Sequence, residues 1–175
     1  SKLVEQYKTF LDGKVGEFGC NTGYHCFLMA EFDNIDSIVA IDVNAEAIDF
    51  GNTHNRKKFS IDIGKKVTFM ESDLRNINLE DEIFDAIVSF HTIEHIYKTH
   101  INAVIQEKYR LLKKGGYALV SLPYLNHFHD PNHVCLYTEH DLEQLFVKNN
   151  FRTVECYLDR SLGNGKHCIH ALFQK

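Results

Sequence analysis

A predicted strand runs directly into a glycine-rich turn at Val15-Gly16-Glu17-Phe18-Gly19-Cys20-Asn21-Thr22-Gly23, and residues 22–31 then have the apolar spacing of a helix. Glycine adopts the unusual backbone angles that such a turn requires. The first turn of a helix leaves backbone N–H groups without internal partners, so these groups can bind a ligand. This order of strand, turn and helix predicts an α/β protein whose backbone approaches a ligand at the turn.

Strands and helices are expected to alternate outward from this stretch, because the apolar spacing switches repeatedly between the two regular periods. Strands are expected at about 14–18, 37–41, 66–70, 84–90 and 117–122, and helices at about 2–11, 22–31, 98–114 and after Thr138. The helix at 98–114 is expected to end at Gly115 and Gly116. We also expect Asn44 to cap a helix after the second strand, and Thr138 to form a capping box with Asp141.

Two last strands, at about 152–158 and 167–174, are expected to form an antiparallel hairpin at one sheet edge, joined across Gly163 and Gly165. The stretch Asn126–Val134 has no clear period and is expected to be a loop. A chain of 175 residues is close to the size of one ordinary domain. The sequence therefore predicts a single α/β domain over residues 1–175, with a doubly wound, mainly parallel seven-stranded sheet that ends in an antiparallel hairpin.

The composition is that of a folded globular domain, with 44% hydrophobic and 25% charged residues. No apolar run is long enough for a membrane-spanning helix, and residues 1–10 lack the apolar centre of a signal peptide, so we expect a cytoplasmic protein. The cysteines have no CxxC spacing, which argues against a disulfide framework and a thiolate zinc site. A net charge of -5 gives no general attraction to nucleic acid, and the short basic clusters at 56–58 and 65–66 are expected to be solvated.

The glycine-rich turn does not fit a nicotinamide site. Counted from Gly19, the G-x-G-x-x-G pattern would place its later glycines at Asn21 and Tyr24. The observed pattern is E-x-G-x-x-x-G, with an acid at the end of the second expected strand, Asp42, and another after the third, Asp73. In this order the residues resemble the class I S-adenosylmethionine-dependent methyltransferases, which have a Rossmann-like fold.

The resemblance implies a role for each of three acidic residues. Glu17 would lie near the amino acid moiety of S-adenosyl-L-methionine, Asp42 would bind the ribose hydroxyls, and Asp73 would bind the adenine amino group. Carboxylates suit these partners because they accept hydrogen bonds from a diol or an amine. Taken alone, Glu17 could be a turn residue, Asp42 a helix cap and Asp73 a solvated loop acid. The full set of expected cofactor-binding residues is Glu17, Gly19, Cys20, Asn21, Gly23, Asp42, Val43, Ser72, Asp73, Leu74 and Phe90.

Later segments carry the same resemblance over nearly the whole chain. Residues 84–95, FDAIVSFHTIEH, are similar to the branch that contains ubiquinone-pathway methyltransferases, and 111–116, 130–133 and 137–138 match its later landmarks. Asn21 departs from the glycine that many members carry. Asparagine tolerates left-handed backbone angles, so we expect altered loop detail and retained binding.

Methyl transfer from a sulfonium needs an in-line arrangement, and it needs a general base only where the acceptor loses a proton. The candidate bases are His91, His95, His127, His129 and His133. His95 and His133, with Glu94, are the expected catalytic residues, because the resemblance places their segments on the substrate side of the pocket.

A divalent metal is a further expectation, with His91, Glu94, His95 and His133 as ligands. A helical turn after the fourth strand would place the first three on one face. In the resembling branches this position reads E-x-x-E-H, and some members bind a metal there. His91 replaces the leading glutamate, which favours zinc, iron or nickel over magnesium. The alternative is a metal-free enzyme in which Glu94 and His95 are ordinary pocket residues and His133 is a loop residue.

Three functions remain open at this point. The first is methylation of a small-molecule acceptor, expected at oxygen, which agrees with the short chain and the acidic balance. The second is RNA ribose 2′-O-methylation, because Glu94, His95 and His133 also resemble the branch that methylates the 3′-terminal ribose of small RNAs. The third is a non-catalytic module that binds the cofactor as a sensor or as the partner of an active enzyme.

Overall fold

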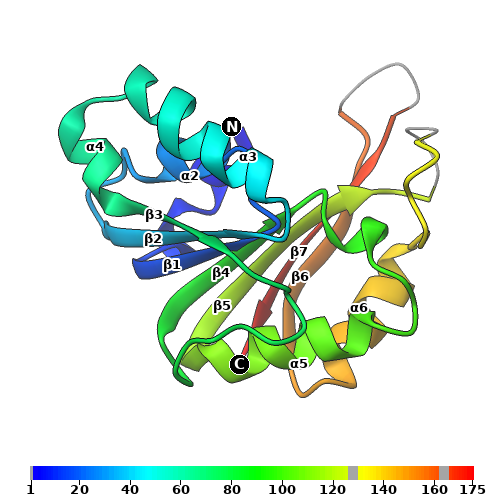
Figure 1. Cartoon of the computed structure of the whole chain (residues 1–175). Coiled ribbons are helices and arrows are strands. Elements are labelled where there is room, and N and C mark those ends of the chain that lie inside the picture. Colours follow the sequence, from blue (N-terminus) through cyan, green and yellow to red (C-terminus); the bar gives the residue numbers. More distant parts are fainter. Residues whose placement is uncertain (1, 126–129, 162–165) are drawn as a thin grey trace.

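A seven-stranded sheet with the order β3-β2-β1-β4-β5-β7-β6 forms the centre of the protein in the computed structural model, which describes residues 2–125, 130–161 and 166–175 (Figure 1). The strands are β1 (Gly13–Phe18), β2 (Ile35–Asp42), β3 (Val67–Glu71), β4 (Phe84–Phe90), β5 (Leu112–Pro123), β6 (Arg152–Asp159) and β7 (Cys168–Gln174). Strands β1 to β5 pair in parallel, and β7 pairs antiparallel with both β5 and β6. The predicted Rossmann-like sheet with a C-terminal antiparallel hairpin is confirmed.

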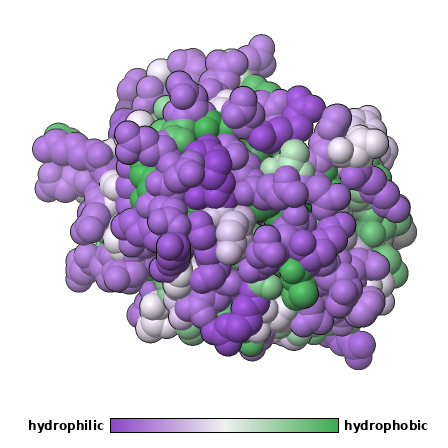
Figure 2. Space-filling model, turned by 90° about the horizontal axis from the view of Figure 1, so that it is seen from below, coloured by the Kyte–Doolittle hydropathy of each residue, from purple (hydrophilic) through white to green (hydrophobic). Residues whose placement is uncertain are grey.

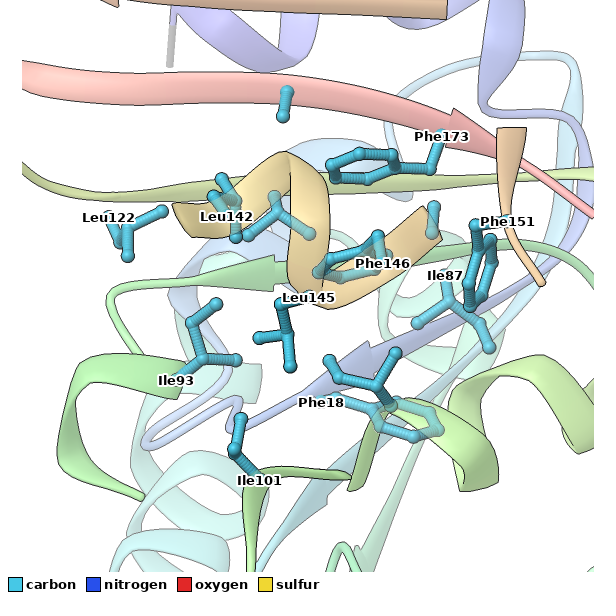
Figure 3. Close-up of a cluster of buried hydrophobic side chains, with 14 of the residues drawn as sticks. Phe18, Ile87, Ile93, Ile101, Leu122, Leu142, Leu145, Phe146, Phe151 and Phe173 are labelled. Carbon is cyan, nitrogen blue, oxygen red and sulfur yellow. The ribbon is translucent and has the colours of Figure 1, made fainter. Parts of the chain in front are cut away.

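Helices cover both faces of the sheet, as a doubly wound fold requires (Figure 1). They are α1 (Lys2–Gln6), α2 (Tyr24–Met29), α3 (Ala45–Phe50), α4 (Ile61–Lys66), α5 (Ile101–Leu111) and α6 (Glu139–Val147). Helices α5 and α6 pack on one face, where Phe146 stacks on Phe173 with ring centroids 4.0 Å apart (Figure 3). Helices α1 and α2 pack on the other face, through residues such as Val4 and Phe27.

Strand β1 lies between β2 and β4. From β1 the chain adds β2 and β3 on one side of the sheet, and it then crosses to the other side to add β4 and β5. In open α/β sheets, ligands bind in the crevice beyond the carboxyl ends of the strands at such a point. The glycine-rich turn after β1 and the segment after β4 therefore meet at the edge where a cofactor is expected.

Two predicted caps are confirmed. The Asn44 side chain accepts a hydrogen bond from the Ala47 amide at the start of α3. Thr138 and Asp141 form the expected reciprocal capping box at the start of α6. These side chains satisfy backbone N–H groups that the first turn of a helix leaves free.

Two predicted helices have different bounds. The helix expected over 2–11 ends at Gln6, and a separate 3-10 turn covers Lys8–Phe10. The helix expected over 98–114 ends at Leu111, so Gly115 and Gly116 belong to β5. Buried Leu112 already pairs with Phe84 of β4, so the chain enters the sheet before it reaches these glycines.

The predicted loop is only partly within the described chain. Residues 130–134 have no regular structure, as expected, whereas residues 126–129 lie outside the described residues. The glycines expected to join the last two strands, Gly163 and Gly165, also lie outside them.

The outer surface is mainly polar on the face seen from below, where hydrophilic residues surround smaller hydrophobic patches (Figure 2). Among the helices of the described residues, none combines the length and the apolar character needed to cross a membrane.

Candidate active site

The turn after β1 is closely packed and depends on its glycines. Gly19 has φ +82, and a Cβ there would lie 2.3 Å from the Thr92 side chain. Gly23 has φ +69, and a Cβ there would lie 2.4 Å from the Phe69 ring. Asn21 has φ 49, the left-handed conformation that we expected asparagine to tolerate. Asparagine therefore takes the left-handed conformation at the position where many members of the family carry glycine.

Asp42 at the end of β2 holds the glycine-rich turn against the start of α3. Its Oδ2 accepts a hydrogen bond from the Asn21 amide at 2.7 Å, and its Oδ1 accepts one from the Asn44 amide at 2.9 Å. Each carboxylate oxygen can accept a second hydrogen bond. Asp42 can therefore bind a diol while it continues to order the turn.

Glu17 is buried beneath the same turn, with 2% of its surface exposed. The Cys26 thiol donates a hydrogen bond to Glu17 Oε2 at 2.6 Å, and His25 Nδ1 lies 3.8 Å from Oε1. Burial raises the pKa of Glu17 to about 8, although the Cys26 hydrogen bond acts in the opposite direction. A cationic ligand group beside this carboxyl would favour its charged form.

Asp73 after β3 is already paired with a cation. The Arg75 guanidinium donates hydrogen bonds to both carboxylate oxygens, and the Arg75 amide also bonds Oδ1 at 2.9 Å. These bonds hold the pKa of Asp73 at about 2. An adenine amino group would therefore share this carboxylate with Arg75.

A cavity of about 660 Å³ brings most of the predicted cofactor residues together. Its lining includes Glu17, Gly19, Cys20, Asn21, Asp42, Val43, Asp73, Leu74 and Phe90. Gly23 and Ser72 are not part of the lining. Gly23 precedes the first residue of α2, where it has a left-handed backbone conformation. The Ser72 amide donates a hydrogen bond to the Asp42 carbonyl.

Several lining residues were not predicted, among them His25, Arg75, Tyr97 and His100. Arg75 stands two residues after Asp73, so an acid–base pair at that position was visible in the sequence. His25 could have been suspected from its place in the first turn after the glycines. Tyr97 and His100 come from a segment without regular structure and carry no comparable signal.

The helical turn after β4 differs from the expected one, because it is a 3-10 turn over Ile93–His95 that begins after His91. His91 has φ 50, and its Nδ1 lies 3.6 Å from Glu94 Oε1. Burial alone would lower the pKa of His91, but the Cys168 thiol and the Glu94 carboxylate raise it to about 9. We predicted one helical turn that contains His91, Glu94 and His95. This prediction is wrong for His91, which lies before the turn.

Glu94, His95 and His133 nevertheless come together, with ligand atoms within 4.8 Å of one another. Glu94 is 1% exposed, and neither of its carboxylate oxygens has a hydrogen-bond partner among the described residues. His95 Nδ1 lies 3.0 Å from the Asn132 carbonyl, and the rings of His95 and His133 lie 4.9 Å apart. Of these three residues only His95 lines the cavity. The other two candidate bases, His127 and His129, lie outside the described residues.

Comparison with known proteins agrees with this geometry. Residues 16–120 match the family described as "Methyltransferase domain". The chain is 31% identical over 112 residues to an arsenite methyltransferase of Aquipseudomonas alcaligenes, with 61% of this chain and 32% of that protein covered. It is 30% identical over 116 residues to a ubiquinone/menaquinone biosynthesis C-methyltransferase of Brucella canis, with 62% of this chain and 41% of that protein covered.

The fold is shared with solved structures at lower identity. The crystal structure of the N-methyltransferase NodS from Bradyrhizobium japonicum WM9 superposes with a TM-score of 0.78 at 18% identity. That match covers 99% of this chain and 92% of the other. The chain spans only about a third to two fifths of the two curated relatives named above. On the family match, this chain belongs to the methyltransferase-domain family, within the class I S-adenosylmethionine-dependent methyltransferases.

Proposed function

We propose that this chain transfers the methyl group of S-adenosyl-L-methionine to an oxygen atom of a small-molecule acceptor. The observation that carries the proposal is that Glu17, Asp42 and Asp73 line the same cavity as His91 and His95. Acidic groups suited to the cofactor and histidines suited to the acceptor thus share one site at the carboxyl edge of the sheet. We also propose that residues 1–175 form one domain, although the curated relatives are longer.

The donor set fits the cofactor. Asp42 would accept the ribose hydroxyls, Glu17 would face the ammonium group, and Asp73 would accept the adenine amine beside Arg75. The lack of a side chain at Gly19 would allow the backbone of the turn to approach the ligand closely. A cavity of about 660 Å³ is within the usual range for a site of this kind.

The cofactor supplies an activated methyl group, so this chain's residues mainly orient the reactants and exclude water. Orientation of this kind can contribute roughly 7–11 kcal/mol to lowering a barrier. His95 lines the cavity and would hold or remove the acceptor proton, with His133 packed against it. The buried carboxylate of Glu94 lies within 4.8 Å of a ring nitrogen of each histidine and would help to hold the two rings in place.

The test is binding followed by transfer. Calorimetry with S-adenosylhomocysteine should show binding, and tritium from labelled cofactor should enter a small-molecule fraction. Absence of binding at millimolar ligand would refute the proposal. Transfer into RNA would favour ribose 2′-O-methylation, and binding without any transfer would favour a non-catalytic module.

A divalent metal beside the cofactor is a second proposal, supported by the buried carboxylate of Glu94, whose oxygens have no hydrogen-bond partner among the described residues although His91 lies 3.6 Å away. Native structures rarely leave a buried carboxylate without a hydrogen bond. Glu94, His95 and His133 would hold the ion, and one carboxylate with two imidazoles suits zinc, iron or nickel. When bound, such an ion would lower the pKa of an acceptor hydroxyl. His91 would then act as a neighbour of Glu94, within 3.6 Å of it.

A further inference from the structure

A second cavity of about 670 Å³ lies next to the cofactor cavity, on the face of the sheet that α1 covers. The two cavities share His25, Phe90 and His91 in their linings, whereas the cofactor acids Glu17 and Asp42 belong only to the first. Within the described chain, a ligand in the second cavity would therefore meet the cofactor across these shared residues.

Helix α1 forms the outer wall of the second cavity and is tied to β6. Gln6 Nε2 donates a hydrogen bond to the Tyr157 hydroxyl at 3.2 Å, and the Tyr7 hydroxyl donates one to Glu155 Oε2 at 2.5 Å. Leu3 and Gln6 of α1 face strand residues across the space. Helix α1 thus covers one side of the cavity, whose volume is in the range of small-molecule sites.

One wall of this cavity is a row of side chains across four neighbouring strands. Phe90 pairs with Ser121, Ser121 with His170, and His170 with Tyr157. Directly paired residues point to the same face of a sheet. Strands are about 4.8 Å apart, so the His170 backbone lies about 10 Å from that of Phe90. The wall changes from an aromatic ring near the cofactor to polar groups at the far end.

The polar end is a histidine–aspartate pair. His170 Nε2 lies 3.3 Å from Asp159 Oδ2, and the Ser161 amide donates a hydrogen bond to Asp159 Oδ1 at 2.8 Å. The Ser161 amide and His170 lower the pKa of Asp159, so its carboxylate can only accept hydrogen bonds. His170 Nε2 must therefore carry the proton. Because burial lowers the pKa of His170, its ring is neutral and Nδ1 is left as a bare acceptor.

His170 Nδ1 is buried and has no hydrogen-bond partner among the described residues. The whole residue is 7% exposed and lines the cavity. An unpaired buried acceptor costs about 1–3 kcal/mol, and such groups in native proteins usually bind a water or a ligand. A ligand with a hydroxyl or amino group would supply the missing donor after a small adjustment of the wall.

We infer that the second cavity binds the methyl acceptor, and that this acceptor is a small organic molecule with a hydroxyl or amino group that hydrogen-bonds to the His170–Asp159 pair. This inference rests on the proposed function. The group bound at His170 would lie roughly 10 Å from Phe90, the residue of this wall that both cavities share. An acceptor of that length is larger than an inorganic ion, and the donor group at its far end determines specificity.

The experiment uses the full chain, tritium-labelled S-adenosylmethionine and the small-molecule ultrafiltrate of an extract from the cells that produce the protein. His170→Phe should raise the amount of ultrafiltrate needed for half-maximal transfer by about tenfold, the effect of losing roughly 1.4 kcal/mol of binding. Its maximal rate and its affinity for S-adenosylhomocysteine should stay near wild type. His140→Phe makes the same change at an exposed residue that lines neither cavity, and it should have no effect.

Each result is decisive. Unchanged transfer by His170→Phe overturns the inference, as does transfer by the wild type into RNA or into no small molecule while S-adenosylhomocysteine still binds. If the wild type fails to bind S-adenosylhomocysteine, the proposed function itself is refuted, which calorimetry distinguishes. Should His170→Phe not fold, His170→Gln is measured in the same way, and unchanged half-saturation there overturns the inference.

Discussion

The Cys26 thiol donates a hydrogen bond to the Glu17 carboxylate across 2.6 Å, beneath the floor of the cofactor cavity. Burial and the nearby Glu17 raise the pKa of Cys26 well above that of a free thiol, so the thiol keeps its proton and remains a donor. Cys26→Ala would remove this donor and raise the Glu17 pKa further. We expect S-adenosylhomocysteine to bind several-fold more weakly at neutral pH, a loss of about 0.5–1.5 kcal/mol in calorimetry. Cys26→Ser retains a donor and should bind more tightly than Cys26→Ala; equal binding by both would contradict this role.

Cofactor affinity should depend on pH through Glu17. The pKa of Glu17 in the free protein is about 8, because burial disfavours its charge. A cofactor ammonium would stabilise the charged form, so binding must displace a proton below that pH. Affinity should therefore rise as the pH increases toward 8 and then level off. Calorimetry in buffers of different ionisation enthalpy should detect the released proton, and Glu17→Gln should abolish both effects.

Much of the fold was predictable because its signals are local. The caps at Asn44 and Thr138, the buried strand Phe84–Phe90 and the glycine-rich turn each depend on a few adjacent residues. The end of α5 was misjudged because Leu112 is drawn into the sheet by pairing with Phe84. A tertiary contact of this kind overrides a helix-ending glycine that stands three residues further along the chain.

The site residues that belong to the family's sequence pattern could be predicted, whereas those outside the pattern could not. Glu17, Asp42 and Asp73 were placed in order along the chain, and all three line one cavity. The sequence shows an arginine two residues after Asp73, but the contact of the Arg75 guanidinium with both carboxylate oxygens depends on side-chain conformation. The pairing of His170 with Asp159 depends on the register of two antiparallel strands, so sequence alone did not single out either residue.

Asp42→Ala should weaken S-adenosylhomocysteine binding, whereas Asp49→Ala on the adjacent helix α3 should not. The substitution would remove the carboxylate proposed to bind the ribose, and it would also release the Asn21 and Asn44 amides. The expected loss is about 1.5–3 kcal/mol, or roughly tenfold or more in affinity. Asp49→Ala removes an exposed acid from α3 that does not line the cavity, and it should bind like the wild type. Equal affinities for the two variants would disprove the ribose role.

Lys108 should make folding stability depend on pH. Its side chain is fully buried on α5, its Nζ has no hydrogen-bond partner among the described residues, and it lies 4.2 Å from the centre of the Phe18 ring. Burial lowers the pKa of Lys108 from 10.5 to about 7. Between these values the unfolded chain binds more protons, so the free energy of unfolding should rise with pH across this window and be lowest below pH 7.

Lys108→Met would replace the buried amine with an apolar side chain of similar length. We expect the free energy of unfolding at pH 7 to increase by about 1–3 kcal/mol, and its rise toward alkaline pH to become smaller. Lys57→Met makes the same change at an exposed position and should alter neither quantity. Denaturant titrations at several pH values provide the measurement. If Lys108→Met is less stable than the wild type, the contact of the amine with the Phe18 ring stabilises the protein by more than the burial of the amine destabilises it.

The proposed metal predicts that transfer requires an ion held by Glu94, His95 and His133. Elemental analysis of tag-free protein should find zinc, iron, nickel or a similar ion, and exhaustive chelation should remove both the ion and the activity. Glu94→Gln removes the buried charge while keeping the side-chain size, and it should lower metal affinity by at least about tenfold, since even indirect partners of a metal contribute that much. His140→Gln, on the exposed side of α6, should retain the metal. Full activity after chelation, together with a harmless Glu94→Ala, would exclude the metal and leave His95 as the group that takes the acceptor proton.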